Sequence, residues 1–221
     1  AAGSPARGSA SEEGKPPADT TAGDGPWRIA GRVALKPERY RAVLAHMVGH
    51  RRWSTAQIAD NWSPFQRMAV EFFEDCRVDT LLIREYPGLR RLLLALHPKP
   101  VEGACDPETT SCLRHRLAML SRAILDPGHG YRDASLKAFV ARFHALLQDG
   151  PASTADMASL ALAYVAKTRR QSDQLASVHF DDTVIDYRDD NRHLWRYIED
   201  SDDEEFFDDP GKTLAKESEI S

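Results

Sequence analysis

The sequence predicts an all-α fold, an irregular domain of about six or seven helices with disordered segments at both ends. Two observations carry this prediction. Apolar residues recur at three- and four-residue steps within segments that are bounded by capping residues, prolines and glycines. No alternating, β-branched run of convincing length occurs in the 221 residues. The chain is 42% hydrophobic and 29% charged, which suits one soluble domain with disordered ends.

The longest predicted helix begins after Ser63 and ends at Tyr86. The Ser63 hydroxyl can cap the first free amides, Pro64 suits the first helical position, and Gln66 completes a capping box. Pro87 cannot continue the amide ladder and disfavours the helical conformation of the residue before it. The apolar residues of one face are Phe65, Met68, Phe72, Cys76 and Ile83.

Charged residues lie in the middle of this same helix, although apolar residues surround much of it. An unpaired buried charge is very costly, so carboxylates here need partners or a metal ion. We therefore expect Arg77 to pair with Glu74, Asp75, Asp79 or a carboxylate of a neighbouring helix. Asp75, Arg77 and Asp79 are accordingly predicted to have structural or interaction roles.

The other helices follow from similar start and stop signals. They are predicted over Pro37 to His50, Thr55 to Asn61, Leu89 to His97, from a cap at Thr109 or Thr110 to Leu125, from a cap at Asp133 to Leu147, from Ser153 to about Arg170, and, as a short helix, Asn191 to Glu199. In the helix capped by Asp133, the predicted buried face is Leu136, Phe139, Val140, Phe143, Leu146 and Leu147.

Composition divides the chain into four parts. Residues 1–26 lack aromatic and long aliphatic side chains and are predicted to be a disordered lead-in or linker. Residues 27–170 form the predicted helical domain, and residues 171–198 a polar extension with one short helix. Residues 199–221 begin with a dense run of carboxylates and are predicted to be an acidic disordered linker or tail.

The overall charge and the cysteine content exclude several classes of protein. A net charge of −5 gives no basic surface for nucleic acid, and no apolar run is long enough to span a membrane. Three cysteines are an odd number and do not indicate a disulfide framework. We therefore expect a cytoplasmic protein, with secretion after removal of a signal peptide left open.

Two histidines form the strongest candidate metal site. His46 and His50 lie four residues apart, so both imidazoles of a helix can bind one ion, as in His-Glu-x-x-His zinc peptidases. The next long helix supplies Glu74 and Asp75, whose carboxylates can provide a third ligand for zinc, and Glu74 is the one predicted. Met47 stands where those peptidases carry the catalytic glutamate, and a thioether cannot accept a proton. No catalytic residue is therefore predicted, and the alternative is that the two histidines only cap, stack or face water.

Two further patterns are weaker. Cys105, Cys112 and His115 are ligand types, but their spacing matches no zinc finger or ribbon, and they are interpreted as a loop thiol and a buried thiol beside a helix start. Residues 126–130, Asp-Pro-Gly-His-Gly, lack the Gly-x4-Gly-Lys pattern of a phosphate-binding loop and are interpreted as a helix break.

Several of these motifs together resemble one known family. They are His46-x3-His50, Ser63-Pro64-x-Gln66-Arg67, Glu74-Asp75-x-Arg77-Val78-Asp79 and Pro87-Gly88-Leu89. In this order they resemble the region upstream of the von Willebrand factor A domain in nitric oxide reductase activation proteins of the NorD type. The resemblance covers roughly residues 35–200. Related proteins carry a His-Glu-x-x-Gly-His-like helix, whereas this chain has Met47 in place of the glutamate and Asp79 at the final acidic position.

The resemblance implies a non-catalytic adaptor that works with a MoxR-type AAA+ ATPase to remodel or mature a target metalloenzyme such as nitric oxide reductase. The Asp-x-Ser-x-Ser metal site of a von Willebrand domain does not occur in this sequence. The chain is therefore expected to be a fragment, or to act with that domain as a separate chain. The alternative function is a zinc-binding, degenerate peptidase-like domain, and a scaffold of unrelated role is also left open.

Overall fold

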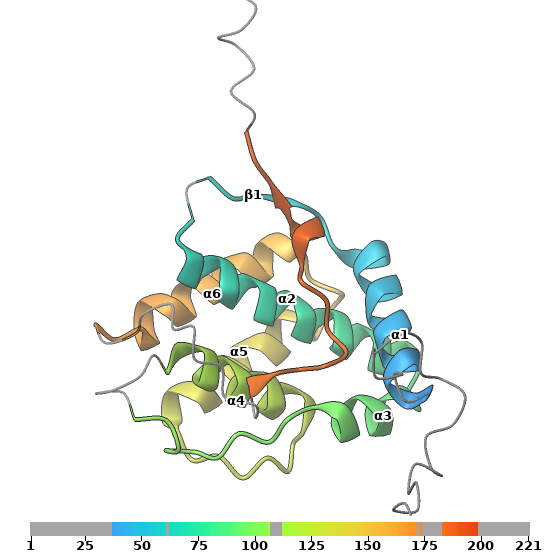
Figure 1. The fold of residues 1–221 in the computed structure, drawn as a ribbon, viewed down its shortest axis with the longest axis horizontal. Coiled ribbons are helices and arrows are strands. Elements are labelled where there is room, and N and C mark those ends of the chain that lie inside the picture. Colours follow the sequence, from blue (N-terminus) through green and yellow to red (C-terminus); the bar gives the residue numbers. More distant parts are fainter. Residues whose placement is uncertain (1–36, 61, 107–111, 172, 174–182, 199–221) are drawn as a thin grey trace, which may run out of the picture. The chain divides into compact units, whose positions relative to one another are not determined.

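The computed structural model describes residues 37–60, 62–106, 112–171, 173 and 183–198. Within these ranges the fold is all-α, as predicted (Figure 1). The predicted disordered ends, the start of order near Trp27 and the cap at Thr109 or Thr110 lie outside the described residues. The described elements are α1 (Pro37–Trp53), β1 (Gln57–Ile58), α2 (Pro64–Glu85), α3 (Leu89–Leu96), α4 (Leu113–Leu125), α5 (Ala134–Leu146), α6 (Thr154–Thr168), the 3₁₀ turn η2 (Arg192–Leu194) and β2 (Trp195–Arg196).

Helix α2 is the central element of the domain. It packs against α1, α4 and α6, and Figure 1 shows these helices arranged around it. Its predicted capping box is confirmed: the Ser63 hydroxyl accepts from the Gln66 amide, and the Gln66 side chain accepts from the Ser63 amide. Phe72 and Cys76 are buried, as the apolar pattern predicted. Because α2 is covered on several sides, the charged residues in its middle, Glu74, Asp75, Arg77 and Asp79, have almost no access to water.

Helix α1 approaches α2 closely at Gly49. A Cβ atom built at this glycine would lie 2.5 Å from Cγ1 of Val78 and 3.2 Å from Cδ1 of Leu82. Glycine is thus the residue that allows the two backbones to approach, with His46 and His50 on either side of the contact. The sequence reveals no signal for this contact beyond an isolated helical glycine.

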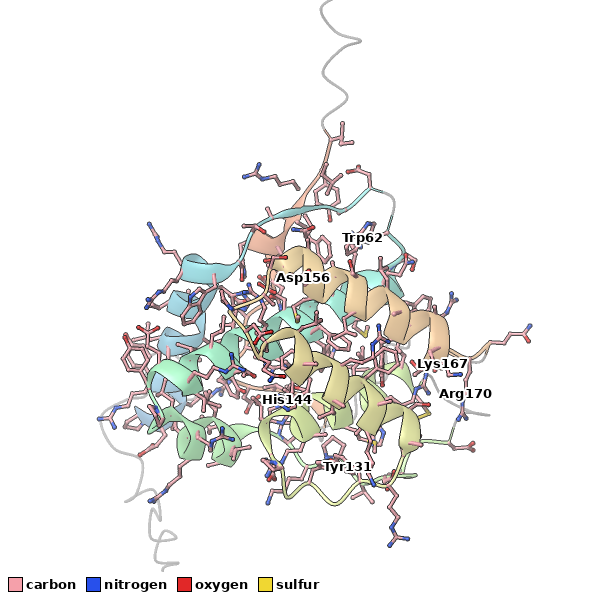
Figure 2. The ribbon with its side chains drawn as sticks, turned by 180° about the vertical axis from the view of Figure 1, so that it is seen from behind. Trp62, Tyr131, His144, Asp156, Lys167 and Arg170 are labelled. Atoms are coloured by element: carbon pink, nitrogen blue, oxygen red, sulfur yellow. A yellow bond between two sulfur atoms is a disulfide. The ribbon has the colours of Figure 1, made fainter. Side chains whose placement is uncertain are left out.

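Helices α5 and α6 complete the core, and their predicted caps are confirmed. The Asp133 carboxylate accepts from the Leu136 amide, and Ser153 and Asp156 form a capping box. Figure 2 shows Asp156 at the beginning of α6 and Lys167 near its end. The prediction that Leu146 is buried is wrong, because this side chain is 42% exposed, whereas Leu147 is fully buried. Leu146 lies at the edge of the apolar face, about 100° round the helix from Leu147.

Two predicted short helices are replaced by a strand pair. Residues 57–58 and 195–196 form a two-stranded parallel sheet, with Gln57 opposite Trp195. Where a helix was predicted over residues 55–61, the structure has the strand β1, and where one was predicted over residues 191–199 it has the 3₁₀ turn η2 followed by β2. These segments are too short for helical periodicity to fix their structure, and tertiary pairing decides their conformation. Segment 183–198 thereby crosses the domain beside α2 (Figure 1).

Cys105 and Cys112 form a disulfide bond, which corrects the expectation of two unpaired thiols. Cys76 is the free cysteine and is buried. The odd cysteine count had concealed a pair that closes a short loop before α4. Of the described helices, none combines the length and the apolar character that crossing a membrane requires.

We expect Gly49→Ala to lower the free energy of unfolding, because the new methyl group overlaps Val78. Overpacking of this kind costs about 1–3 kcal/mol, which exceeds the gain of about 0.5–1 kcal/mol from placing alanine in a helix. Gly88→Ala is the matched control, since no atom lies within 4 Å of a Cβ built there. Urea denaturation measures both variants, and equal midpoints for the two would contradict the close approach of α1 and α2.

Candidate metal centre

Four charged side chains of α2 are buried at the centre of the domain: Glu74, Asp75, Arg77 and Asp79. The predicted pairing of Arg77 is confirmed and its partner is Glu74. The Arg77 Nε donates to Glu74 Oε2 at 2.8 Å, and its Nη2 donates to Glu74 Oε1 at 2.6 Å. Arg77 also donates to the carbonyl oxygens of Trp53, Pro151 and Ala152. The guanidinium therefore ties α2 to the end of α1 and to the loop before α6.

Glu74 is not a ligand of the histidine pair, which corrects the sequence-based expectation. Besides Arg77, its Oε1 accepts hydrogen bonds from the hydroxyls of Ser54 at 2.5 Å and Thr154 at 3.0 Å. The carboxylate is thus held on the side of α2 that faces α6. Its neighbour Asp75 points about 100° further round the helix and reaches the imidazoles instead.

His46, His50 and Asp75 converge on one point between α1 and α2. The two Nε2 atoms are 2.9 Å apart, and Asp75 Oδ1 lies 3.1 Å from His50 Nε2 and 3.5 Å from His46 Nε2. Within the described ranges, these three residues form the group whose ligand atoms are close enough to share a metal ion. Donor atoms of a tetrahedral zinc ion are ~3.3 Å apart, because each lies ~2.0–2.1 Å from the metal. The separations observed here are close to that value.

Each imidazole is oriented through its other nitrogen. His46 Nδ1 is 2.9 Å from Asp79 Oδ1, and His50 Nδ1 is 2.9 Å from the Ser54 hydroxyl oxygen. The single hydroxyl proton of Ser54 goes to Glu74, so Ser54 can only accept from His50. Asp79, as a carboxylate, can only accept from His46. Both Nδ1 atoms therefore carry hydrogen, and both Nε2 atoms are available as metal ligands.

The converging atoms need a positive charge between them. When both imidazoles are neutral, His46 Nε2, His50 Nε2 and Asp75 Oδ1 direct lone pairs at one another. One added proton on His50 Nε2 satisfies all three atoms, because this N–H can donate to His46 Nε2 at 2.9 Å and to Asp75 Oδ1 at 3.1 Å. A metal ion at the centre would be attracted to the same three atoms, so the geometry fits either a proton or a metal ion.

The C-terminal segment supplies the remaining partners of this cluster. Arg188 Nη2 donates to Asp79 Oδ2 at 2.7 Å, and the Tyr187 hydroxyl donates to the same oxygen at 2.8 Å. Arg188 Nη1 lies 3.7 Å from Asp75 Oδ2. Sequence reasoning missed Tyr187, Arg188 and Ser54, because no spacing or motif links segment 183–198 to α2. An aromatic-basic pair in an otherwise polar segment is the only signal the sequence offers for it.

These contacts shift the acid–base equilibria of the cluster. Burial alone would lower the pKa of His46, but the carboxylates of Asp79 and Asp75 raise it to about 9. Burial would raise the pKa of Asp79, but Arg188 and His46 hold it at about 2. Burial acts in the same way on Asp75, and Arg188 and the two histidines hold its pKa well below the usual range. At neutral pH both carboxylates are therefore ionised and His46 is protonated, so a metal ion would have to displace the His46 proton.

Three other sequence-predicted features do not belong to this centre. Met47 is 49% exposed and lies on the outer face of α1, so its position is not directed at the converging atoms. Cys105 and Cys112 are joined to each other, and His115 is buried in α4. Asp126 accepts hydrogen bonds from the Gly128 amide and from Arg122, so residues 126–130 form a helix-terminating turn, as interpreted.

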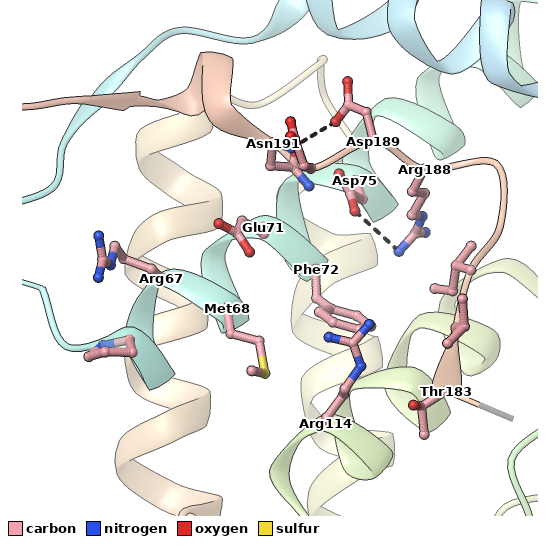
Figure 3. A pocket seen from close by; sticks show the side chains of 14 residues that line it. Arg67, Met68, Glu71, Phe72, Asp75, Arg114, Thr183, Arg188, Asp189 and Asn191 are labelled. Carbon is pink, nitrogen blue, oxygen red and sulfur yellow. Dashed lines mark hydrogen bonds and ion pairs between the residues drawn. The ribbon is translucent and has the colours of Figure 1, made fainter. Parts of the chain in front are cut away.

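A pocket of about 480 Å³ adjoins the cluster, between α2, α4 and segment 183–191 (Figure 3). Asp75 and Arg188 lie in its wall, as does Glu71 one turn earlier on α2. The Glu71 carboxyl accepts from the Trp195 indole at 2.8 Å. Burial raises the pKa of Glu71 to about 7, against the lowering effect of this hydrogen bond.

Comparisons of the chain with protein-family models, with curated proteins and with solved structures found no match. The resemblance to NorD-type proteins therefore rests on the sequence motifs given above.

We expect Arg77→Ala to destabilise the domain, because it leaves the buried Glu74 carboxylate without its counter-ion. Removing one partner of a buried pair costs about 3–5 kcal/mol. Arg52→Ala is the control, since the Arg52–Glu85 pair is on the surface and its loss should hardly change stability. Thermal melting by circular dichroism compares the two, and coincident curves would contradict a structural role for the Arg77–Glu74 pair.

Glu71 should make stability depend on pH. Its pKa rises from 4.5 to about 7 on folding, so the folded state binds this proton more tightly, and stability falls as pH rises between these values. Glu71→Gln keeps an oxygen for the Trp195 indole but has no charge to bury. We expect the variant to be more stable than wild type at pH 8, by on the order of 2–3 kcal/mol, and nearly equal to it at pH 4. Urea titrations at both pH values measure this, and a pH-independent difference would contradict the assignment.

Proposed function

We propose that residues 37–198 form a metal-binding, non-hydrolytic helical domain in which His46, His50 and Asp75 hold a zinc ion. The observation that carries this proposal is the convergence of three ligand atoms at separations close to those around one zinc ion. Two imidazoles and one carboxylate are a donor set that suits zinc. The ion would fasten α1 to α2 and balance the buried carboxylates.

The surroundings of the ligands support the proposal. Imidazoles that bind metals almost always donate their second N–H to a carboxylate or another oxygen, which fixes the ring orientation. His46 does so directly to Asp79, and His50 does so through Ser54 to Glu74. Both rings are thus held in position by groups of α2 and the end of α1 before any ion binds.

The same geometry argues against peptidase activity. Three protein ligands leave one tetrahedral position for a water molecule, and hydrolysis needs a general base beside it. Met47 has no proton-accepting oxygen and lies on the exposed face of α1. Glu74 and Asp79 are already engaged by Arg77 and Arg188. Replacing Met47 by glutamate should therefore not create activity.

We expect the purified protein to bind one equivalent of zinc, measured by elemental analysis after exhaustive dialysis, and to melt at a higher temperature with zinc than without it. His50→Ala and Asp75→Asn should abolish binding. Ser54→Ala should weaken it by about 10–100-fold, because it removes only the group that orients His50. His144→Ala, which removes an exposed histidine of α5, is the control and should bind as wild type.

Glu74→Gln separates the two candidate third ligands. It should retain stoichiometric zinc despite a loss of stability, because Glu74 contacts the centre only through Ser54. Loss of zinc in this variant while Asp75→Asn still binds would contradict the geometry. Absence of zinc from the folded wild-type protein, with no effect of added zinc on its melting, would overturn the proposal.

A second candidate function, the adaptor role, is favoured by the outer face of α1. Apolar side chains of this helix are exposed at positions 40, 44, 47 and 48, which share one face. Val48 is 62% exposed and Tyr40 54%. A contiguous apolar surface rimmed by charged residues is typical of a protein-binding site. The residues that form this surface are Tyr40, Leu44, Met47 and Val48.

We propose that this surface binds the MoxR-type AAA+ ATPase that the NorD resemblance implies, so that the domain serves as an adaptor for a target such as nitric oxide reductase. The buried centre on the opposite face of α1 would hold the surface in a fixed position. This role places the domain in the cytoplasm, where the ATPase has its nucleotide. The Cys105–Cys112 disulfide instead favours an oxidising compartment. The redox state of these cysteines in cells therefore distinguishes a cytoplasmic location from an oxidising one.

We expect the double variant Leu44→Lys, Val48→Lys to lose co-purification with the ATPase without a change in melting temperature, because both side chains are exposed. Val101→Lys, an exposed apolar residue outside α1, is the matched control and should still bind. Equal recovery of the ATPase with all three proteins would contradict the assignment of the adaptor surface to α1.

A further inference from the structure

The pocket beside α2 contains buried polar atoms without partners (Figure 3). Among the described residues, Arg114 Nε, Arg188 Nη1 and Asn191 Oδ1 are buried and make no hydrogen bond, and all three residues line the pocket. The Arg188 side chain is only 5% exposed. Leaving such groups unsatisfied costs free energy, so their presence in one pocket calls for a ligand.

The unpaired groups include two guanidinium N–H donors and one amide acceptor. Arg114 stacks over the Phe72 ring at 5.9 Å, and burial lowers its pKa with only Glu71 opposing. Arg188 uses its Nε and Nη2 on Asp79, and its Nη1 makes no hydrogen bond but lies 3.7 Å from Asp75 Oδ2 in the pocket wall (Figure 3). The backbone of Asn191 has a φ of 55°, a left-handed conformation that asparagine adopts more readily than most residues.

The carboxylates in the same wall are already engaged. Asp75 is held by the histidines, and Glu71 accepts from the Trp195 indole. Asp189 accepts from the Asn191 amide, and Asp190 pairs with the exposed Arg192. Arg188 is also paired with Asp75 and Asp79, so the open donors of the pocket are Arg114 Nε and Arg188 Nη1, which make no hydrogen bond.

We propose that this pocket binds a small organic anion that also carries a hydroxyl or ammonium donor. Arg114 and Arg188 would bind its carboxylate or phosphate oxygens, and Asn191 Oδ1 would accept from its donor group. Met68 and Phe72 form apolar parts of the wall for the carbon skeleton. The volume of about 480 Å³ is in the range of small-molecule sites.

This proposal goes beyond the zinc site, with which the pocket shares Asp75, but it rests on different atoms. The histidines do not line the pocket, and the unpaired donors are on α4 and segment 183–191. The two proposals are separated by measuring anion binding on metal-free protein, prepared with a chelating resin and kept in a buffer without carboxylates or phosphate. A failure of zinc binding then leaves the result for anions unaffected.

The test is isothermal titration of the full chain with L-malate, succinate, glycerol 3-phosphate and inorganic phosphate, with glycerol as the uncharged probe. We expect L-malate or glycerol 3-phosphate to bind and glycerol not to bind; which of the two binds more tightly identifies the anionic group as carboxylate or phosphate. Arg114→Gln should weaken binding by about 10–100-fold, the usual value of a charge-assisted hydrogen bond. Arg142→Gln is the matched control, because Arg142 also stacks on a phenylalanine but lies outside this pocket.

Asn191→Gly tests the acceptor while preserving the left-handed backbone. L-malate should bind more tightly than succinate to the wild type, and this preference should disappear in the variant. Circular dichroism melting of each variant separates loss of a contact from loss of the fold. The proposal is overturned if neither organic anion binds, if folded Arg114→Gln binds as wild type, or if inorganic phosphate alone binds, since water or an adventitious ion only would then satisfy these groups.

Discussion

The structure depends on the burial of four charged residues within one helix. Two sides of α2 carry these charges: Glu74 and Arg77 lie on one side, and Asp75 and Asp79 lie on another. No single neighbouring element can therefore satisfy them all. An isolated buried charge is far too costly to persist, and partners must therefore come from every side. The end of α1, the loop before α6 and segment 183–198 each provide some of them. The packing of the domain around α2 is therefore determined by the pairing of buried charges as well as by the burial of apolar side chains.

This requirement explains why chain segments with little apolar content are fixed in place. Segment 183–198 has few core side chains, yet Tyr187 and Arg188 bind the Asp79 carboxylate, and Trp195 binds Glu71. Gly49 serves the same end from the opposite side, because a larger residue would hold α1 away from α2 and separate the imidazoles from Asp75. The contacts that close the candidate metal centre are thus distributed over residues more than a hundred positions apart.

Much of the fold was predictable, because helix starts and stops are local. The capping boxes at Ser63 and Ser153 and the cap at Asp133 are read directly from residue types and spacing. The third ligand was not predictable from spacing: Glu74 and Asp75 are adjacent, and only the packing of α2 against α1 and α6 decides which of them meets the histidines. The strand pair and the disulfide also escaped prediction, since each joins segments whose pairing is set by tertiary structure or concealed by an odd cysteine count.

The two proposed sites share residues, which has a consequence for how they would act together. Asp75 Oδ1 faces the imidazoles, while its Oδ2 is 3.7 Å from the Arg188 Nη1 that lines the pocket. A cation on Oδ1 would draw electron density from the carboxylate and weaken its hold on the guanidinium. Arg188 would then be a stronger partner for an anion in the pocket, and by linkage the anion would strengthen the binding of the cation. Helix α1 carries His46 and His50 on one side and the exposed apolar residues on the other. Binding of an ion at the buried centre would therefore also fix the position of the exposed apolar surface.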